Sequence, residues 1–376
     1  MVAETGNKRR ITFFVSAMED GGAERVAALL CNYWSQNGHA VNLVVTYSKR
    51  GQCNYTLNER VQVIYLADQV RGRSSGLMSK MIRLRACRKL VQSTESDLVV
   101  SFLAPLNIAI LIATLGLDVP VVVSERVFPE FSLKSRFASF ARRLLYPLAK
   151  TVVVQSSEGE EWLRKHCPGS HVDVIHNPLV HPLPITQPIV LPNKFIAEDK
   201  RVILGVGRLV PKKGFERLIS GFAQFSRGNP KWILALVGQG PEKASLMALA
   251  KRLDLEENVV FPGRIGNLSD WYKRAEVFVL SSYREGFPNV LLEAMSYGVA
   301  SIAADCPSGP ADIIQPDVNG LLVSNKHFAE DLVSGLDKLA GNSILRKAIG
   351  DQAVKIQETC SMESIGLEWD RATGIA

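Results

Sequence analysis

The apolar residues of this chain fall into short runs separated by longer amphipathic stretches. The runs at 11–16, 151–155 and 277–280 are rich in Val, Ile, Leu and Phe and show little alternation with polar residues. Such runs are typical of parallel strands that are buried on both faces, and the stretches between them have the spacing of helices. Strands that alternate with helices predict an α/β protein with parallel sheets flanked by helices.

This alternation occurs twice, with a proline-rich segment between the two halves. Further strands are predicted at 39–46, 61–66, 97–101, 119–124, 172–175, 202–205, 232–237 and 299–303. Five prolines between 178 and 192 suit an extended connection. With 376 residues the chain is long enough for two domains. We predict two doubly wound, Rossmann-like domains at 1–178 and 201–360, a linker at 179–200, and a terminal helix at 361–376 with little room for a core of its own.

The segment 98–117 carries no charged residue over about the length of a bilayer span. Pro105, Asn107 and Gly116 interrupt it, and its first residues resemble a strand more than part of a helix. We therefore predict a buried strand–helix unit here in preference to a transmembrane helix.

The formal net charge of +7 is confined to the first half of the chain, where 22 Lys and Arg stand against 15 Asp and Glu before residue 181. Residues 71–89 contain seven basic residues and no acidic one. The run from Phe131 to Lys150 contains five basic and no acidic residues, interleaved with large apolar side chains. A basic amphipathic helix is typical of a membrane surface, so we predict that this second run meets anionic lipid.

Two other interpretations of the basic runs remain, a solvated face and a nucleic-acid site. The second is disfavoured because no other part of the chain resembles a nucleic-acid module. In the second run, one helical face is shared by Phe137, Phe140, Leu144 and Leu148. We expect that face to pack partly on the sheet, with Arg142 and Arg143 among the cations at its rim.

The stretch 281–295 has the chemistry of a binding site. It follows the apolar run 277–280, and Pro288 lies where a helix could begin, with free backbone N–H groups that suit phosphate. Glu285 lies in the turn. Glu293 lies among apolar neighbours in the helix, where a carboxylate needs a hydrogen-bonding partner such as a sugar or ribose hydroxyl. The alternative is that Glu293 faces solvent on an amphipathic helix.

A second polar loop follows the predicted strand at 202–205. It contains Arg208 and Lys213, and two cations at the carboxyl end of a strand could hold a diphosphate. The loop lacks the Gly-x4-Gly-Lys-Ser/Thr pattern of a Walker loop. Lys212 is interpreted as a surface residue.

Together these segments resemble the retaining glycosyltransferases of the GT-B fold, in the large family 4 that includes bacterial polysaccharide-assembly enzymes. Glu285 and Glu293 match the family's Glu-x7-Glu signature, and Arg208 and Lys213 match its Gly-Arg-Leu…Lys-Gly motif. The Gly-Gly-Ala-Glu loop at 21–24 and the Gly-Gln-Gly-Pro turn at 238–241 extend the resemblance over nearly the whole chain.

The resemblance implies two α/β domains that face a cleft, with the donor nucleotide-sugar on the C-terminal domain and the terminal helix crossing back onto the N-terminal one. It implies that Arg208 and Lys213 stabilise the leaving diphosphate, that Glu285 binds the sugar hydroxyls and that Glu293 binds the ribose. The positions that it assigns to donor binding are Gly22, Gly207, Gly238, Arg264, Ile265, Gly286, Phe287, Pro288, Asn289, Val290 and Glu293.

Glu125 and Arg126 follow the predicted strand at 119–124 and are our candidates for the acceptor side of the site. A structural ion pair is the alternative. Many members of the family have a histidine near this position, whereas this chain has Glu125. Whatever that histidine contributes to donor binding is therefore in question for this chain.

The predicted reaction moves a hexose or N-acetylhexosamine, with retention, from a nucleotide-sugar (UDP is favoured) to a glycan on a polyprenyl diphosphate, in surface polysaccharide assembly. The chain contains no Asp-x-Asp, so neither a metal ion nor another cofactor is expected. The alternatives are a nucleotide-sugar epimerase of the same fold and a non-catalytic module that binds sugar nucleotides or membranes. Six scattered cysteines without a Cys-x-x-Cys pair indicate reduced thiols, and so a cytoplasmic protein at the inner face of the membrane.

Overall fold

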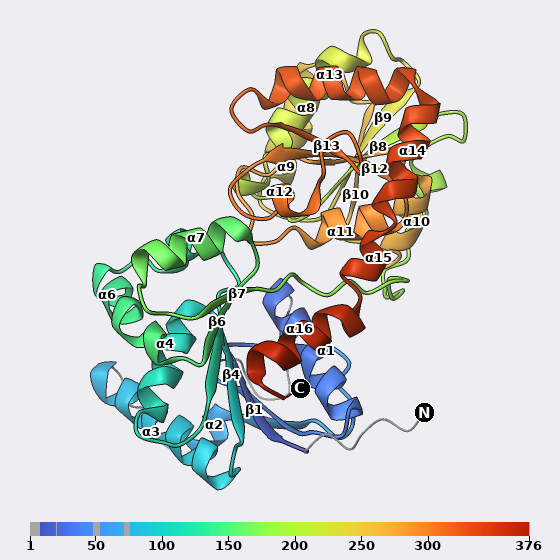
Figure 1. Ribbon diagram of the computed structural model, residues 1–376. Coiled ribbons are helices and arrows are strands. Elements are labelled where there is room, and N and C mark those ends of the chain that lie inside the picture. Colours follow the sequence, from blue (N-terminus) through green and yellow to red (C-terminus); the bar gives the residue numbers. More distant parts are fainter. Residues whose placement is uncertain (1–7, 20, 48–52, 71–75, 376) are drawn as a thin grey trace. The chain divides into compact units, whose positions relative to one another are not determined.

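The structure, a computed structural model, describes residues 8–19, 21–47, 53–70 and 76–375. It divides into two compact units, one formed by residues 1–178 and 362–376 and the other by residues 179–361 (Figure 1). Each unit has its own parallel sheet and its own hydrophobic cores on the two faces of that sheet.

The first unit contains a seven-stranded parallel sheet in the order β3-β2-β1-β4-β5-β6-β7. Its elements are β1 (Arg10–Val15), α1 (Gly22–Gln36), β2 (Ala40–Val45), β3 (Gln62–Tyr65), α2 (Leu66–Gln69), α3 (Gly76–Ser93), β4 (Leu98–Phe102), α4 (Ala104–Thr114), β5 (Val121–Ser124), α5 (Pro129–Ser132), α6 (Arg136–Leu145), η1 (Tyr146–Leu148), β6 (Thr151–Val154), α7 (Ser157–His166), β7 (Val172–Val174) and α16 (Met362–Thr373). The winding reverses where β4 returns to pair with β1. In open α/β sheets, ligands bind at the carboxyl ends of the strands at such a switch point.

The second unit contains a six-stranded parallel sheet in the order β10-β9-β8-β11-β12-β13. Its elements are η2 (Pro192–Lys194), β8 (Arg201–Val206), η3 (Pro211–Lys213), α8 (Phe215–Ser226), β9 (Trp232–Val237), α9 (Lys243–Arg252), β10 (Val259–Gly263), α10 (Leu268–Arg274), β11 (Val277–Leu280), α11 (Asn289–Ser296), β12 (Ala300–Asp305), α12 (Pro310–Ile313), β13 (Leu321–Ser324), α13 (Phe328–Gly341), α14 (Ser343–Ala353) and α15 (Ile356–Thr359). Its winding reverses between β8 and β11. The predicted fold class of two doubly wound parallel sheets is confirmed.

The uncharged segment 98–117 forms the buried strand β4 and the helix α4, as predicted. Within the part of the chain that the structure describes, no helix has the length and apolar character to cross a membrane. The strand β13 had not been predicted.

The proline-rich segment differs from the linker predicted at 179–200, because it belongs to the second unit. Its backbone is tied to the loop after β10, where Thr186 N–H donates to the Gly266 carbonyl at 2.9 Å and Gly266 N–H donates to the Pro188 carbonyl at 2.7 Å. Asn267 and Trp271 hold Val190 by further hydrogen bonds. The proline content of this segment predicted an extended chain, but it could not show that the chain packs against the second unit.

The C-terminal helix α16 packs in the first unit, beside α1 (Figure 1, red beside blue). Trp369 is fully buried, with its ring centroid 6.3 Å from that of Trp34 and 5.7 Å from that of Phe102. Asp370 accepts hydrogen bonds from the Tyr33 hydroxyl at 2.9 Å and the Trp34 indole nitrogen at 2.8 Å. The last helix thus completes a core that the preceding residues of this unit leave open.

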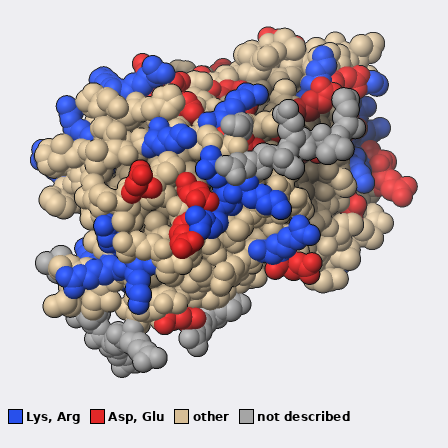
Figure 2. All heavy atoms as spheres, turned by 60° about the horizontal axis from the view of Figure 1, so that its bottom comes forward, with Lys and Arg blue, Asp and Glu red and all other residues tan. Residues whose placement is uncertain are grey.

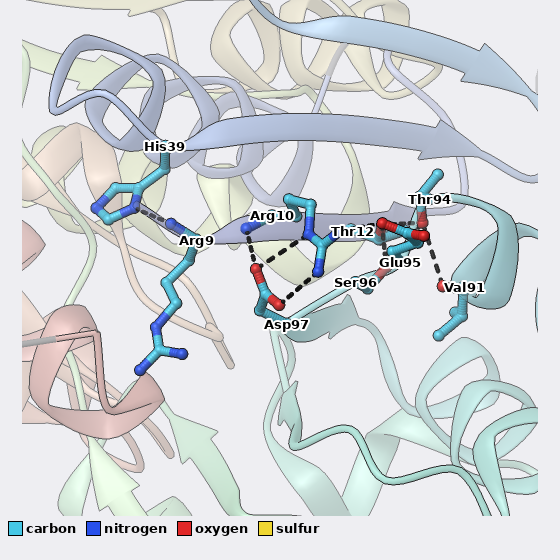
Figure 3. Close-up of polar contacts among 9 residues, drawn as sticks. All are labelled: Arg9, Arg10, Thr12, His39, Val91, Thr94, Glu95, Ser96 and Asp97. Carbon is cyan, nitrogen blue, oxygen red and sulfur yellow. Dashed lines mark hydrogen bonds and ion pairs between the residues drawn. The ribbon is translucent and has the colours of Figure 1, made fainter. Parts of the chain in front are cut away.

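Polar side chains hold β1 and β4 together at their amino ends (Figure 3). Asp97 accepts hydrogen bonds from the Arg10 backbone N–H at 2.8 Å and from its guanidinium at 3.0 Å, and these bonds hold the pKa of Asp97 below its usual value. The buried Thr12 hydroxyl bonds with Ser96 at 2.7 Å. These contacts lie at the edge opposite the carboxyl ends, so we assign them a structural role.

We predict that Asp370→Ala lowers the free energy of unfolding of the first unit by about 2 kcal/mol, because two partly buried donors lose a charged acceptor. Asp351→Ala is the matched control, since Asp351 forms only an exposed ion pair with Lys347 within one helix and should cost less than about 0.5 kcal/mol. Urea denaturation checks both. Equal stability of the two variants would contradict the role given to Asp370.

Candidate active site

The loops after β8 and β9 meet backbone to backbone at the switch point of the second sheet. A Cβ atom on Gly238 would lie 1.8 Å from the Gly207 carbonyl oxygen, and one on Gly240 would lie 2.1 Å from that of Leu209. Leu209 N–H donates to the Gln239 carbonyl at 2.8 Å. Only glycine permits this approach. The Gly-Gln-Gly-Pro turn therefore fixes the loop that carries Arg208.

Lys213 and Glu285 lie together at this edge of the sheet. The Lys213 ammonium is 2.5 Å from Glu285 Oε1, which also accepts a hydrogen bond from the Ser282 hydroxyl at 2.5 Å. Both charged side chains are largely buried. The structure thus brings a residue of the Gly-Arg-Leu…Lys-Gly motif against the first carboxylate of the Glu-x7-Glu signature.

Lys212 is exposed, as predicted, although its amine is partly enclosed beside this charged group. Burial lowers the pKa of its amine, opposed by the nearby Glu285 carboxylate and reinforced by Lys213, Arg208 and Arg284. Lys212 therefore lies within electrostatic range of three other cations and of one carboxylate, which is paired with Lys213. Such an excess of positive charge at the carboxyl ends of strands suits a ligand with several negative charges, such as a nucleoside diphosphate.

The turn and helix after Glu285 have nearly the predicted form. The helix α11 begins at Asn289, so Pro288 is its N-cap rather than its first residue. The Ser308 hydroxyl donates to the Gly286 carbonyl at 2.7 Å, which joins this turn to the loop after β12. Ser308 was not predicted as part of the site. Its backbone φ is 73°, in the left-handed region that non-glycine residues rarely adopt.

Glu293 faces the interior, so the alternative that it lies in solvent is wrong. It is 4% exposed, and its carboxylate accepts a hydrogen bond from the buried Tyr272 hydroxyl at 3.1 Å. Phe287 is buried and packs with the same core, together with Val290. Arg264 and Ile265 follow β10 at the same edge of the sheet, with Arg264 exposed and Ile265 half-buried.

Arg217 is a supporting residue that the sequence analysis missed. Its guanidinium donates to the carbonyl oxygens of Ser281 and Ser282, each at 2.7 Å, and is stacked between the rings of Tyr283 and Phe328. It therefore fixes the backbone that leads to Glu285. An arginine in the amphipathic helix α8 carries no sequence signal for this role.

In the first unit, Glu125 forms a buried ion pair. This is the structural role that was given as the alternative to contact with the acceptor. Glu125 is 2% exposed, and its Oε1 atom accepts from the Tyr146 hydroxyl at 2.6 Å and from Arg142 Nη1 at 3.3 Å. Burial raises the pKa of the Glu125 carboxyl, against the effect of Arg142 and Tyr146. The partner is Arg142, seventeen residues away in sequence, and not the adjacent Arg126.

Arg126 is buried by different neighbours. It donates to Asn177 Oδ1, which also accepts from Gln155 Nε2, and its guanidinium lies 4.6 Å from the Phe102 ring centroid. Its Nε has no hydrogen-bond partner, and no carboxylate among the described residues lies within ion-pair distance. Burial lowers its pKa to about 9, with Glu24 the nearby charge that opposes this effect. The Arg126 guanidinium is therefore a buried cation without an acidic partner among the described residues, near the loop that contains Gly22.

The helix α6 lies with its apolar face outward, so the expectation that this face packs on the sheet is wrong. Phe137 is 79% exposed, Phe140 58% and Leu144 57%, whereas Arg142 is 2% exposed. The Nη1 atom of Arg142 donates to Glu125, to the Pro129 carbonyl and to the Ser132 hydroxyl. Because Arg142 faces the buried carboxylate of Glu125, the opposite, apolar face of α6 faces outward. Arg142 therefore does not belong to the cationic rim that was predicted for this helix.

The basic run at 71–89 has a partly structural role. Residues 71–75 lie outside the described residues. Arg83 donates to the Thr46 carbonyl at 3.1 Å, and Arg88 donates to the Ala113 and Leu115 carbonyls at the end of α4. On the face shown in Figure 2, Lys and Arg side chains form separate groups with Asp and Glu among them. The described side chains visible on that face form no continuous basic stripe of the kind that nucleic acid requires.

Comparison with known proteins gives two adjoining family matches. Residues 21–178 match the glycosyl transferase 4-like domain, and residues 189–356 match glycosyl transferases group 1. A lipopolysaccharide 1,6-galactosyltransferase of Escherichia coli is 31% identical over 66% of this chain and 67% of its own length. This chain belongs to the GT-B glycosyltransferases. Its predicted family is thereby confirmed.

Two further proteins show how far the likeness of this glycosyltransferase extends. A Campylobacter jejuni α-1,4-N-acetylgalactosaminyltransferase named for a GalNAc-GalNAc-diNAcBac-PP-undecaprenol substrate is 27% identical over 96% of this chain and 97% of its own. The solved structure of Anabaena Alr3699/HepE in complex with UDP covers 98% of this chain and 100% of its own, with a TM-score of 0.78 and 18% identity, and so shares the fold. Within the described residues, no cluster of three or more His, Cys, Asp or Glu is placed to hold a metal ion.

We predict that Arg208→Ala and Lys213→Ala each lower the kcat of this glycosyltransferase by about 10²-fold or more, because each removes a cation that stabilises a developing negative charge. Lys251→Ala is the control, since Lys251 is exposed on α9 and pairs only with Glu256 at 3.5 Å. Steady-state turnover, with thermal unfolding to confirm folding, tests this. Near wild-type kcat in both site variants would rule out the assignment.

Proposed function

We propose that this glycosyltransferase transfers a hexose or N-acetylhexosamine from a UDP-sugar, with retention of anomeric configuration, to a glycan carried on a polyprenyl diphosphate. The observation that carries the proposal is the excess of positive charge at the switch point of the second sheet, where Lys213 pairs with Glu285 and Lys212 lies within electrostatic range of Arg208, Lys213 and Arg284. Arg208 and Lys213 stabilise the leaving diphosphate, Glu285 binds the sugar hydroxyls, and the buried Glu293 binds the ribose.

Donor binding in this proposal does not require a metal ion. A leaving diphosphate needs positive charge in place before the reaction, and side-chain cations can supply it as a metal ion would. Arg208 supplies a planar fork of donors, whereas Lys213 supplies a point charge. The backbone N–H groups at the start of α11, near Gly286, add a partial positive charge.

The proposed acceptor class rests on the names of the relatives and on the first unit. Two similar Campylobacter jejuni proteins are named for undecaprenyl-diphosphate-linked substrates, and the Escherichia coli relative is named for lipopolysaccharide. The first unit keeps Arg126 unpaired at the carboxyl ends of its strands. We assign that edge to the acceptor.

Incubation of the protein with UDP-sugars and undecaprenyl-diphosphate-linked oligosaccharides tests the proposal. We expect one UDP-sugar to give a product longer by one residue with an α-linkage, and to do so in excess EDTA. Conversion of the nucleotide-sugar to its epimer without transfer would instead show an epimerase. Nucleotide binding without any product would show a non-catalytic module. Loss of activity in EDTA that Mg²⁺ or Mn²⁺ restores would overturn the metal-free part.

We also propose that the protein attaches peripherally to an anionic membrane through α6. Its exposed apolar side chains lie in a run that includes the exposed cations Lys134, Arg136 and Arg143 and no acidic residue. Full burial of a Phe or Leu side chain is worth about 1.5–3 kcal/mol, whereas a cation near an anionic surface adds about 1 kcal/mol. Insertion of the apolar face therefore contributes more than the cations.

Sedimentation with phosphatidylglycerol vesicles tests the membrane proposal. We expect the wild-type protein to bind, and to retain part of this binding as salt is raised. The triple variant Phe137→Ser/Phe140→Ser/Leu144→Ser should not bind, because it removes the inserted groups. Ile344→Ser is the control, since Ile344 is 82% exposed on α14 in the other unit. Equal binding by the wild-type protein and the triple variant would show that α6 is only a solvated face.

A further inference from the structure

The segment 53–58 holds α1 near its beginning and along its length. Asn54 N–H donates to the Met18 carbonyl at 2.9 Å, in the loop that leads to α1. On the helix itself, the Asn32 side chain donates to the Thr56 carbonyl at 2.9 Å and accepts from Asn58 N–H at 2.7 Å. The side chain of Tyr55 is therefore carried on a backbone that has fixed positions on both sides.

Tyr55 uses its hydroxyl to hold both backbone groups of Gly21. It accepts from Gly21 N–H at 2.9 Å and donates to the Gly21 carbonyl at 2.7 Å, which a hydroxyl can do because it is both donor and acceptor. Gly21 is the N-cap of α1 and has an extended backbone with no side chain to cap the helix. The phenol therefore fixes the residue from which the Gly-Gly-Ala-Glu loop enters the helix.

The position of Gly21 in turn controls that of Glu24. A methyl group on Gly21 would lie 2.0 Å from Glu24 Oε2, so the carboxylate occupies the space that the glycine leaves. Glu24 also interacts electrostatically with Arg126, whose Nε has no partner. Glu24, in the first turn of the helix after β1, and Arg126, just after β5, thus lie at the same carboxyl edge of the first sheet without forming an ion pair. Together they offer both the acceptor and the donors that a sugar hydroxyl requires.

We propose that Tyr55 is a positioning residue for the acceptor: by holding Gly21 it keeps the Glu24 carboxylate at the sheet edge that also carries Arg126, and these two side chains bind hydroxyl groups of the acceptor sugar. The inference rests on the proposed function, in which this edge of the first unit receives the acceptor. Tyr55 itself touches no substrate in this arrangement. Its effect passes through the backbone of Gly21.

Tyr55→Phe, with Tyr33→Phe as its matched control, tests the inference. Both variants lose one phenol oxygen in the first unit, but the Tyr33 hydroxyl bonds to Asp370 on α16, away from Gly21. We expect Tyr55→Phe to raise the KM for the acceptor about tenfold, the effect of losing one to two hydrogen bonds, with the KM for the UDP-sugar and kcat little changed. Tyr33→Phe should lower the melting temperature comparably and leave both KM values unchanged.

Gly21→Ala gives an independent route to the same result. Its extended backbone accepts alanine, but the methyl group displaces the Glu24 carboxylate. We expect it to raise the acceptor KM as Tyr55→Phe does, and the double variant to show less than the product of the two effects, because both act through one contact.

A lower melting temperature with unchanged acceptor KM in Tyr55→Phe would show a purely structural role and overturn the inference. So would a rise confined to the KM for the UDP-sugar, or fully independent effects of the two substitutions. Failure of the wild-type protein to form any product would instead overturn the proposed function. The two failures are therefore distinguishable.

Discussion

The candidate donor site depends on the direct backbone contact between the loops after β8 and β9. Gly238 and Gly240 lie so close to the carbonyl oxygens of Gly207 and Leu209 that no side chain fits between them. This contact fixes the loop that carries Arg208 and η3, and η3 in turn ends at Lys213. Arg217 fixes the facing loop through the Ser281 and Ser282 carbonyls. The charged side chains are thus carried by loops whose backbone is held in place. Little rearrangement of these side chains is then needed when negative charge develops on a bound ligand.

The first unit depends on a buried ion pair and the hydrogen bonds around it. Glu125 and Arg142 are both almost fully enclosed, and each would be costly alone, but Tyr146, Ser132 and the backbone supply further hydrogen bonds. The consequence for α6 is its orientation. Because Arg142 must face this network, Phe137 and the other large apolar side chains face outward. A buried polar contact therefore creates the apolar surface that we assign to the membrane.

The two switch points carry opposite balances of charge and pairing. At the second sheet, several cations lie within electrostatic range of one another, and the Glu285 carboxylate among them is paired with Lys213. At the first sheet, Arg126 is buried among neutral partners, and among the described residues Glu24 is the carboxylate whose charge opposes the effect of that burial. The excess of positive charge at the second sheet suits a ligand of high negative charge, and the site at the first sheet suits hydroxyl groups. This difference matches the proposed division between a diphosphate-bearing donor and a sugar acceptor.

The sequence by itself determined the fold class, most strands, and the positions of Arg208, Lys213, Glu285 and Glu293, because periodicity and local motifs depend on neighbouring residues. It placed β9 and β11 to the residue, since continuous apolar runs have sharp ends. Only the tertiary structure decided which polar groups bond to one another: Glu125 with Arg142, Arg217 with two backbone carbonyls, and the Tyr55 hydroxyl with Gly21. It also decided that the apolar face of α6 points outward and that the proline-rich segment packs on the second unit. Each of these depends on partners far apart in sequence, and helical or strand periodicity gives a residue's face but not what lies against it.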